Sequence, residues 1–109
     1  MTPRRGELWW VALDPVVGSE IRKTRPCLIL STDVVNEHRR TVVVAPLSSG
    51  PSAHPPITVA MRCEGREVVA VVDQVRAIAK RRLRARIGHA TDAEIAAVGN
   101  ALKEVLELP

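Results

Sequence analysis

Two polar segments carry most of the side chains in this sequence that could bind or react with a phosphate. Residues 18–26 (GSEIRKTRP) combine a carboxylate, cations and hydroxyl groups, and residues 46–50 (PLSSG) add two neighbouring hydroxyls. A glycine in each segment lets the backbone approach a ligand closely. Both segments adjoin apolar, strand-like runs, so together they favour an anion-binding cleft.

The charge balance points the same way. The chain has 109 residues and a formal net charge of +4, from 16 Lys and Arg against 12 Asp and Glu. Most of the basic side chains are Arg, whose planar guanidinium suits bidentate phosphate contacts. The acids outnumber the bases only after residue 91, so residues 1–91 are the more basic part. A polyanionic partner is favoured, although a basic surface without a ligand is about as common.

Metal and membrane chemistry are not indicated. The three histidines are scattered, and Cys27 and Cys63 lie far apart, so neither a metal site nor a disulfide framework is expected. No apolar run approaches the roughly 20 residues that span a bilayer, and the first residues lead into a strand pattern without a signal-peptide core. We expect a cytoplasmic protein with reduced cysteines, no cofactor and no membrane contact.

Short apolar runs between turn signals predict a mainly β chain. The expected strands are residues 8–13, 27–30, 41–45 (ended by Pro46), 57–60 and 67–72, with 75–78 continuing the last one after a kink. The fourth and fifth form a hairpin around Glu64-Gly65. One helical turn is expected at residues 34–36, and the basic residues 80–86 are expected to form a short helix or turn.

The last segment predicts an amphipathic helix. Thr91 and Glu94 fit a capping box, and apolar residues recur at helical spacing from Ile95 to Leu106. Five or six short strands with one terminal helix favour a small, strongly curved sheet or barrel with the helix packed against it. A single domain over residues 1–109 is expected.

Four segments in this order resemble the MazF/PemK family of toxin endoribonucleases over about residues 4–108. They are RGELWWVALDP, GSEIRKTRPCLILS, TVVVAPLSS and VVDQVRAIAKRRL. The resemblance implies a small SH3-like (PemK/CcdB-like) β-barrel with a C-terminal helix. It also implies a homodimeric type II toxin, an mRNA interferase that cleaves single-stranded RNA without a metal and so inhibits translation and growth. The implied inhibitor is a MazE-like antitoxin with a flexible acidic segment.

The resemblance also carries site residues. Arg25 and Ser48 match the family's catalytic Arg and Thr, and Glu20 matches a carboxylate whose role is less settled. Without a metal, the substrate's 2′-OH attacks the phosphorus, leaving a 2′,3′-cyclic phosphate and a 5′-OH. A guanidinium can bind two non-bridging oxygens of the transition state, but its pKa above about 12 makes Arg25 a poor base. The expected RNA-binding residues are Ser19, Arg22, Lys23, Thr24, Ser49, Gln74 and Arg76.

Plainer interpretations accompany these residues. Arg25 could be a loop cation, Ser48 a turn-forming hydroxyl, and Glu20 a surface acid paired with a neighbouring cation. Asp73 and Gln74 interrupt an apolar run as either a bulge or a substrate-facing pair. His54 would be the usual ribonuclease residue, but no partner histidine lies near it in the sequence.

Aromatic side chains are scarce, which limits how a base could be recognised. The chain has no Phe or Tyr, so only Trp9 or Trp10 could stack on a base, and strand alternation sends one of them inward. Trp10 matches the family's aromatic strand position and is expected in the core. We then expect bases to be recognised by hydrogen bonds and by stacking on the planar guanidinium groups of Arg side chains. Two other functions remain open: a CcdB-like toxin that binds gyrase without nuclease activity, and an inert SH3-like binding module.

Overall fold

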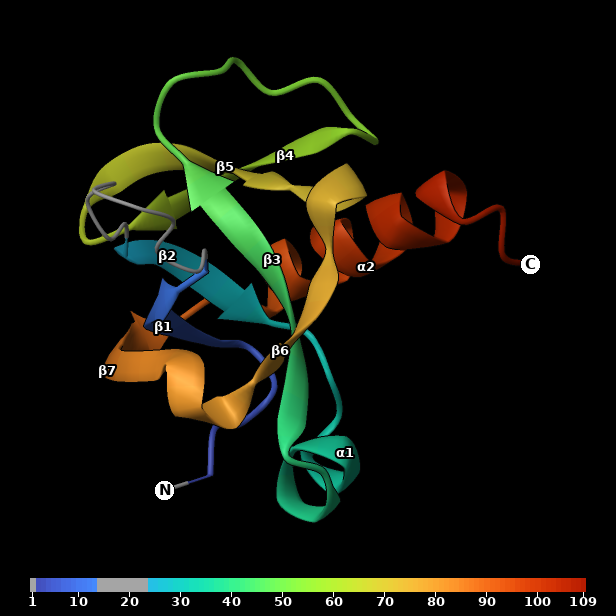
Figure 1. Ribbon diagram of the computed structural model, residues 1–109. Helices are drawn as coiled ribbons and strands as arrows, with labels where there is room; N and C mark the ends of the chain where they lie inside the picture. Colours follow the sequence, from blue (N-terminus) through green and yellow to red (C-terminus); the bar gives the residue numbers. More distant parts are fainter. Residues whose placement is uncertain (1, 14–23) are drawn as a thin grey trace, which may run out of the picture.

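The protein is described here from a computed structural model, which covers residues 2–13 and 24–109. Antiparallel pairing links seven strands in the order β4-β5-β3-β2-β1-β7, and β6 pairs with β3 off this path (Figure 1). The strands are β1 (Glu7–Ala12), β2 (Thr24–Ile29), β3 (Thr41–Ser48), β4 (Thr58–Cys63), β5 (Arg66–Val71), β6 (Arg76–Ala79) and β7 (Leu83–His89). The helices are α1 (Asp33–His38) and α2 (Asp92–Val105), with 3₁₀ turns η1 (Val72–Gln74) and η2 (Lys80–Arg82).

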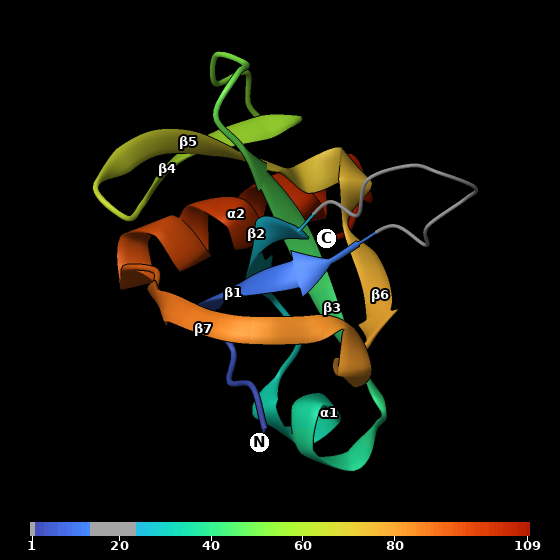
Figure 2. The same cartoon turned by 60° about the vertical axis from the view of Figure 1, so that its left-hand side comes forward.

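The long strand β3 makes the sheet curl, because it changes partner along one edge. Its first half pairs with β6, from Thr41↔Ala79 to Val44↔Arg76, and its end pairs with β5 at Leu47↔Ala70. The other edge of β3 pairs with β2. Figures 1 and 2 show β3 crossing the middle of the molecule, with the β4–β5 hairpin at one end and α1 at the other.

The prediction that Pro46 ends the third strand is wrong, because β3 runs on to Ser48. The carbonyl of Val43 accepts from the backbone N–H of Leu30, so alternate residues of β3 direct their polar groups toward β2. Pro46 therefore faces the other edge, between the last pair with β6 and the first with β5. A missing N–H at that gap breaks no ladder hydrogen bond.

Two apolar clusters fill the two faces of the curled sheet. One lies beneath α2 and includes Leu8, Leu28, Leu47, Met61, Val72, Val98 and Ala101. The other includes Trp9, Val11, Cys27, Ile29, Val42, Val44 and Ile78. Strand alternation explains the division, since neighbouring residues of β1 and β2 fall into different clusters.

The expected core position of Trp10 is wrong, and its neighbour occupies the core. Trp9 is 2% exposed, whereas Trp10 is half-buried. Trp9 shares its face of β1 with Val11 and packs in the second cluster, where its indole Nε1 donates to Glu7 Oε1 at 3.0 Å. Trp10 faces the other side, and α2 covers mainly β4 and η1 rather than this end of β1.

Three local helix and turn predictions are confirmed. Thr91 caps α2, and its hydroxyl accepts from the Glu94 backbone while the Glu94 carboxylate accepts from the Thr91 N–H. The helical turn expected at residues 34–36 is the centre of α1, which Thr32 caps. The hairpin turns at Glu64 (φ 53°) and Gly65 (φ 76°), the two positive φ values that a two-residue type I′ turn requires. No helix of the described residues is long and apolar enough to cross a lipid bilayer.

In residues 72–89 one prediction is wrong and another is confirmed. Only residues 80–82 form the expected turn, and the rest of the basic segment continues as β7, which lies along β1 (Figure 2). Residues 75–78 continue the β5 arm after a kink, as predicted, because η1 interrupts the arm and β6 then pairs with the same edge of β3 as β5 does. Both strands form through partners distant in sequence, which no local pattern specified.

Candidate active site

Arg25 and Ser48 lie across from each other on neighbouring antiparallel strands. The pairing of β2 with β3 ends at Cys27↔Pro46, and Arg25 and Ser48 each lie two residues beyond that pair, at the same end of the two strands. Alternation places these two residues on the same face of the sheet. Sequence positions 23 residues apart therefore meet at one point, where a single phosphate could contact both.

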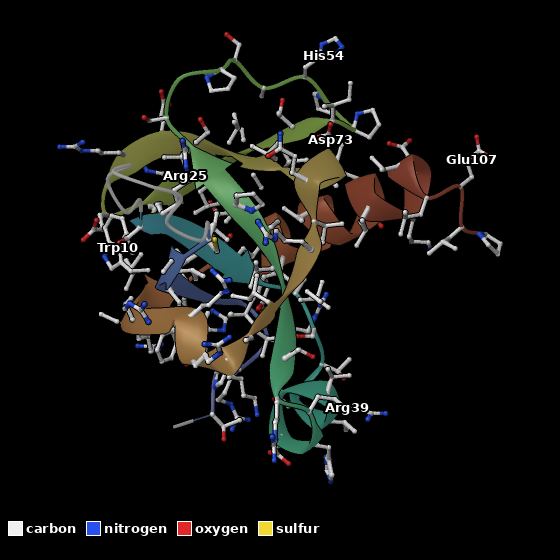
Figure 3. All side chains as sticks on the ribbon, in the orientation of Figure 1. Trp10, Arg25, Arg39, His54, Asp73 and Glu107 are labelled. Atoms are coloured by element: carbon white, nitrogen blue, oxygen red, sulfur yellow. The ribbon has the colours of Figure 1, made fainter. Side chains whose placement is uncertain are left out.

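Both residues line one open cleft of about 850 Å³. Three elements form its walls: the ends of β1 and β2, the end of β3, and the β4–β5 hairpin. The lining residues are Trp10, Thr24, Arg25, Pro26, Leu47, Ser48, Ser49, Cys63, Glu64, Arg66 and Val68. Figure 3 shows Trp10 and Arg25 on the same side of the molecule, away from Arg39 and Glu107. The cleft thus combines apolar side chains with hydroxyls, two cations (Arg25 and Arg66) and one carboxylate (Glu64).

The guanidinium of Arg25 is available to a ligand. The side chain is exposed, and it makes no ion pair with another residue of the described chain. Ser48 is half-buried beside it, and Ser49 is exposed. A fork of N–H donors next to a hydroxyl donor can bind the non-bridging oxygens of a phosphate and stabilise charge that builds up on them.

Cys27, two residues after Arg25 in β2, is not a nucleophile. Cys27 is fully buried in the strand that carries Arg25, and burial raises the pKa of its thiol to about 12 despite the opposing charges of Arg76 and Arg25. Its Sγ lies 3.8 Å from the carbonyl oxygen of Arg25. At neutral pH it stays a protonated thiol, which packs under the backbone of Arg25.

The structure brings together only some of the residues predicted to bind RNA. Thr24 and Ser49 line the cleft with Arg25 and Ser48. Gln74 is exposed in η1 and Arg76 is exposed on β6, and neither belongs to the lining, although the charge of Arg76 reaches Cys27. The predicted residues Ser19, Glu20, Arg22 and Lys23 lie outside the described residues.

Three other candidate residues, Asp73, Gln74 and His54, are exposed. Asp73 and Gln74 are exposed in the 3₁₀ turn η1, so they do not form a bulge within a strand. His54 is exposed in the loop before β4, where its backbone pairs with Thr58, and it does not line the cleft.

Sequence reasoning missed the far wall of the cleft. Glu64, Arg66 and Val68 come from the β4–β5 hairpin, which the sequence predicted as a hairpin but did not place over the polar segments. Trp10 was also missed. The alternation of β1 was the available signal, because it leaves one Trp on each face.

The sequence is similar to known proteins over almost its whole length. The sequence model of the family described as "PemK-like, MazF-like toxin of type II toxin-antitoxin system" matches residues 4–106. The chain is 37% identical to Endoribonuclease MazF9 of Mycobacterium tuberculosis, over 96% of this chain and 97% of the relative. It is 33% identical to Endoribonuclease EndoA of Bacillus subtilis, over 99% and 97% respectively.

Solved structures share the fold. A MazE–MazF complex from Deinococcus radiodurans (Form-II) has a TM-score of 0.87 at 25% identity, covering 100% of this chain and 99% of that one. An endoribonuclease in complex with its cognate antitoxin from Mycobacterial species has a TM-score of 0.79 at 27% identity, covering 98% and 97%. These matches confirm the expected curled β-sheet with a C-terminal helix. The relatives are named endoribonucleases, which favours a nuclease over a gyrase-binding toxin.

Proposed function

This chain belongs to the PemK-like, MazF-like toxin family of type II toxin–antitoxin systems, and on that premise we propose that it is a metal-independent endoribonuclease that cuts single-stranded RNA. The observation that carries the proposal is the meeting of Arg25 and Ser48 across β2 and β3 in one open cleft. The proposal takes residues 1–109 as one toxin domain, in line with the family match over residues 4–106.

In the proposed reaction the 2′-OH of the substrate attacks the adjacent phosphorus. The bond to the 5′-oxygen breaks, so one fragment ends in a 2′,3′-cyclic phosphate and the other begins with a 5′-OH. Arg25 binds two non-bridging oxygens and stabilises their growing charge, and the Ser48 hydroxyl donates to the same group. Arg25 stays protonated throughout, so proton transfer needs another group. Glu20 remains our candidate for that role.

The remaining predicted contacts fall into two groups. Thr24 and Ser49 line the cleft, and we assign them to contacts with the RNA near the cut. Ser19, Arg22, Lys23, Gln74 and Arg76 are assigned to flanking phosphates or bases. A polyanion that approaches a basic surface is attracted over several ångströms, and salt weakens that attraction.

We propose an acidic antitoxin segment as the protein partner, since one of the similar structures is an endoribonuclease with its cognate antitoxin. Both the antitoxin and RNA would seek the same basic cleft, so the two should compete. A homodimer and a cytoplasmic location complete the proposal. Simultaneous binding of RNA and antitoxin in a titration would refute the overlap.

The decisive experiment incubates the purified protein with a long single-stranded RNA in EDTA and identifies the fragment ends by mass spectrometry. We expect cleavage to persist and to leave 2′,3′-cyclic phosphate and 5′-OH ends. One 2′-deoxy substitution immediately 5′ to the cut should block it, because the nucleophile is then missing. A 5′-phosphate product would mean attack by water and would refute the mechanism, and intact RNA would refute the nuclease proposal.

A further inference from the structure

Trp10 is the one indole that a ligand can reach in the described part of the chain. The sequence has no Phe or Tyr, and its two Trp side chains differ in environment. Trp9 is 2% exposed, and its indole N–H is used by Glu7. Trp10 is half-buried and forms part of the cleft wall that also carries Arg25 and Ser48.

The strand pairing around Trp10 is regular on one side and irregular on the other. On one side it pairs with Pro26 of β2. On the other side Trp9 pairs with Arg86 and Val11 with Leu83, so two residues of β7 lie opposite the single residue Trp10. This register shift has the form of a β-bulge in β7, which increases the local twist of the β1–β7 pair.

The position of Trp10 relative to Arg25 suits a nucleotide. Directly paired residues of neighbouring strands carry their side chains on one face, about 5 Å apart, so Pro26 lies against the Trp10 side chain and fixes its ring. Arg25 precedes Pro26 and pairs with Val11, so strand alternation directs Arg25 and Trp10 to opposite faces, and the two side chains share a site only because both line the cleft where the strands end. A nucleotide whose phosphate binds Arg25 in this cleft has the Trp10 ring in the same cleft for its base.

We propose that Trp10 is the stacking platform for one unpaired base of the RNA next to the phosphate that is cut. This inference rests on the proposed function and names one subsite of it. Every nucleobase presents a π-face, so the platform orders the strand in the cleft without selecting a base by itself.

The test measures coupling between the ring and one base. The cut is first mapped on a long RNA with wild-type protein, and an oligonucleotide spanning it is made uncleavable by a 2′-deoxy residue at the cut. Abasic sites then replace the bases one at a time, and Kd is measured for wild type, Trp10→Leu and Trp10→Phe. In wild type, one position next to the cut should lose roughly tenfold in affinity when its base is removed.

With Trp10→Leu, the intact oligonucleotide should bind about tenfold more weakly, and removing that same base should cost nothing further. Trp10→Phe keeps a ring and should retain most of the loss on base removal. Quenching of tryptophan fluorescence by the intact oligonucleotide should largely disappear in Trp10→Phe, because Trp9 is sealed in the core. Val34→Ala, which changes an exposed apolar residue on α1, should match wild type in every assay.

The outcomes separate this inference from the proposed function. A wild-type protein that leaves RNA intact refutes the nuclease whatever Trp10 does. A wild-type protein that cuts RNA, with equal abasic losses in wild type and Trp10→Leu at every position, refutes the stacking platform alone. If Trp10→Leu fails to fold, Trp10→Phe decides: quenching that survives undiminished in that variant, or abasic losses absent at every position in wild type, overturns the inference.

Discussion

Replacing Arg25 by Ala should remove most of the cleavage activity and leave the fold intact. Arg25 is exposed at the rim of the cleft, and no other described residue forms an ion pair with it. Surface substitutions of this kind usually change the free energy of unfolding by no more than about 0.5 kcal/mol. The expected loss is therefore in the reaction and not in stability.

The size of the loss follows from what the guanidinium contacts. Removing one preorganised donor from the charge that develops in a transition state commonly costs about 10²–10³ in rate, or roughly 3–4 kcal/mol. Arg25 offers two donors at once to the phosphate, so Arg25→Ala should reach or exceed the upper end of that range. Arg25→Lys keeps the charge but loses the planar fork and should fall between wild type and Ala.

The assay is single-turnover cleavage of a labelled RNA oligonucleotide in EDTA, so that the chemical step is measured apart from binding. Circular dichroism and thermal unfolding report the fold. Arg39→Ala is the matched control, because Arg39 is equally exposed but lies beside α1, at the other end of the molecule (Figure 3). Arg25→Ala cleavage within a few-fold of the Arg39→Ala rate, in a normally folded protein, would move the catalytic centre elsewhere.

Three further changes test other parts of the structure. Ser48→Thr should keep the cleavage rate and Ser48→Ala should lower it, since the hydroxyl makes the phosphate contact. A larger loss in Ser49→Ala would move that role to the next residue. Thr91→Ala removes the acceptor for the Glu94 N–H at 3.1 Å and should lower the free energy of unfolding by about 1 kcal/mol in urea, with cleavage unchanged. Burial alone would raise the pKa of Glu7, but hydrogen bonds from the Arg4 backbone, Trp9 and Arg86 hold it below its usual value of 4.5. The stability that Glu7 supplies is therefore complete above that value and lost as the pH falls through the lowered pKa, so Glu7→Gln should flatten the acid limb of a plot of Tm against pH. If Tm falls as steeply at acidic pH in Glu7→Gln as in wild type, other carboxylates cause the acid destabilisation.

Local sequence patterns determined several elements correctly. The capping box of Thr91 and Glu94 marked the start of α2, and Glu64-Gly65 marked the hairpin, because a cap and a two-residue turn depend on neighbours within four positions. The order of the four family segments also identified Arg25 and Ser48 as the residues to test. None of these inferences needed the position of any distant residue.

The tertiary structure decided which strands pair and which side chains are buried. β7 reads as a basic, exposed segment, yet it pairs with β1, and Arg86 forms a 2.7 Å ion pair with Glu7, 79 positions away. The alternation of β1 required that the two Trp side chains face opposite ways, but only the packed sheet shows that Trp9 is covered and Trp10 is open. Burial depends on which remote strands close over a residue, and that choice is made by the free energy of the whole packed core, not by the residues on either side of it in the chain.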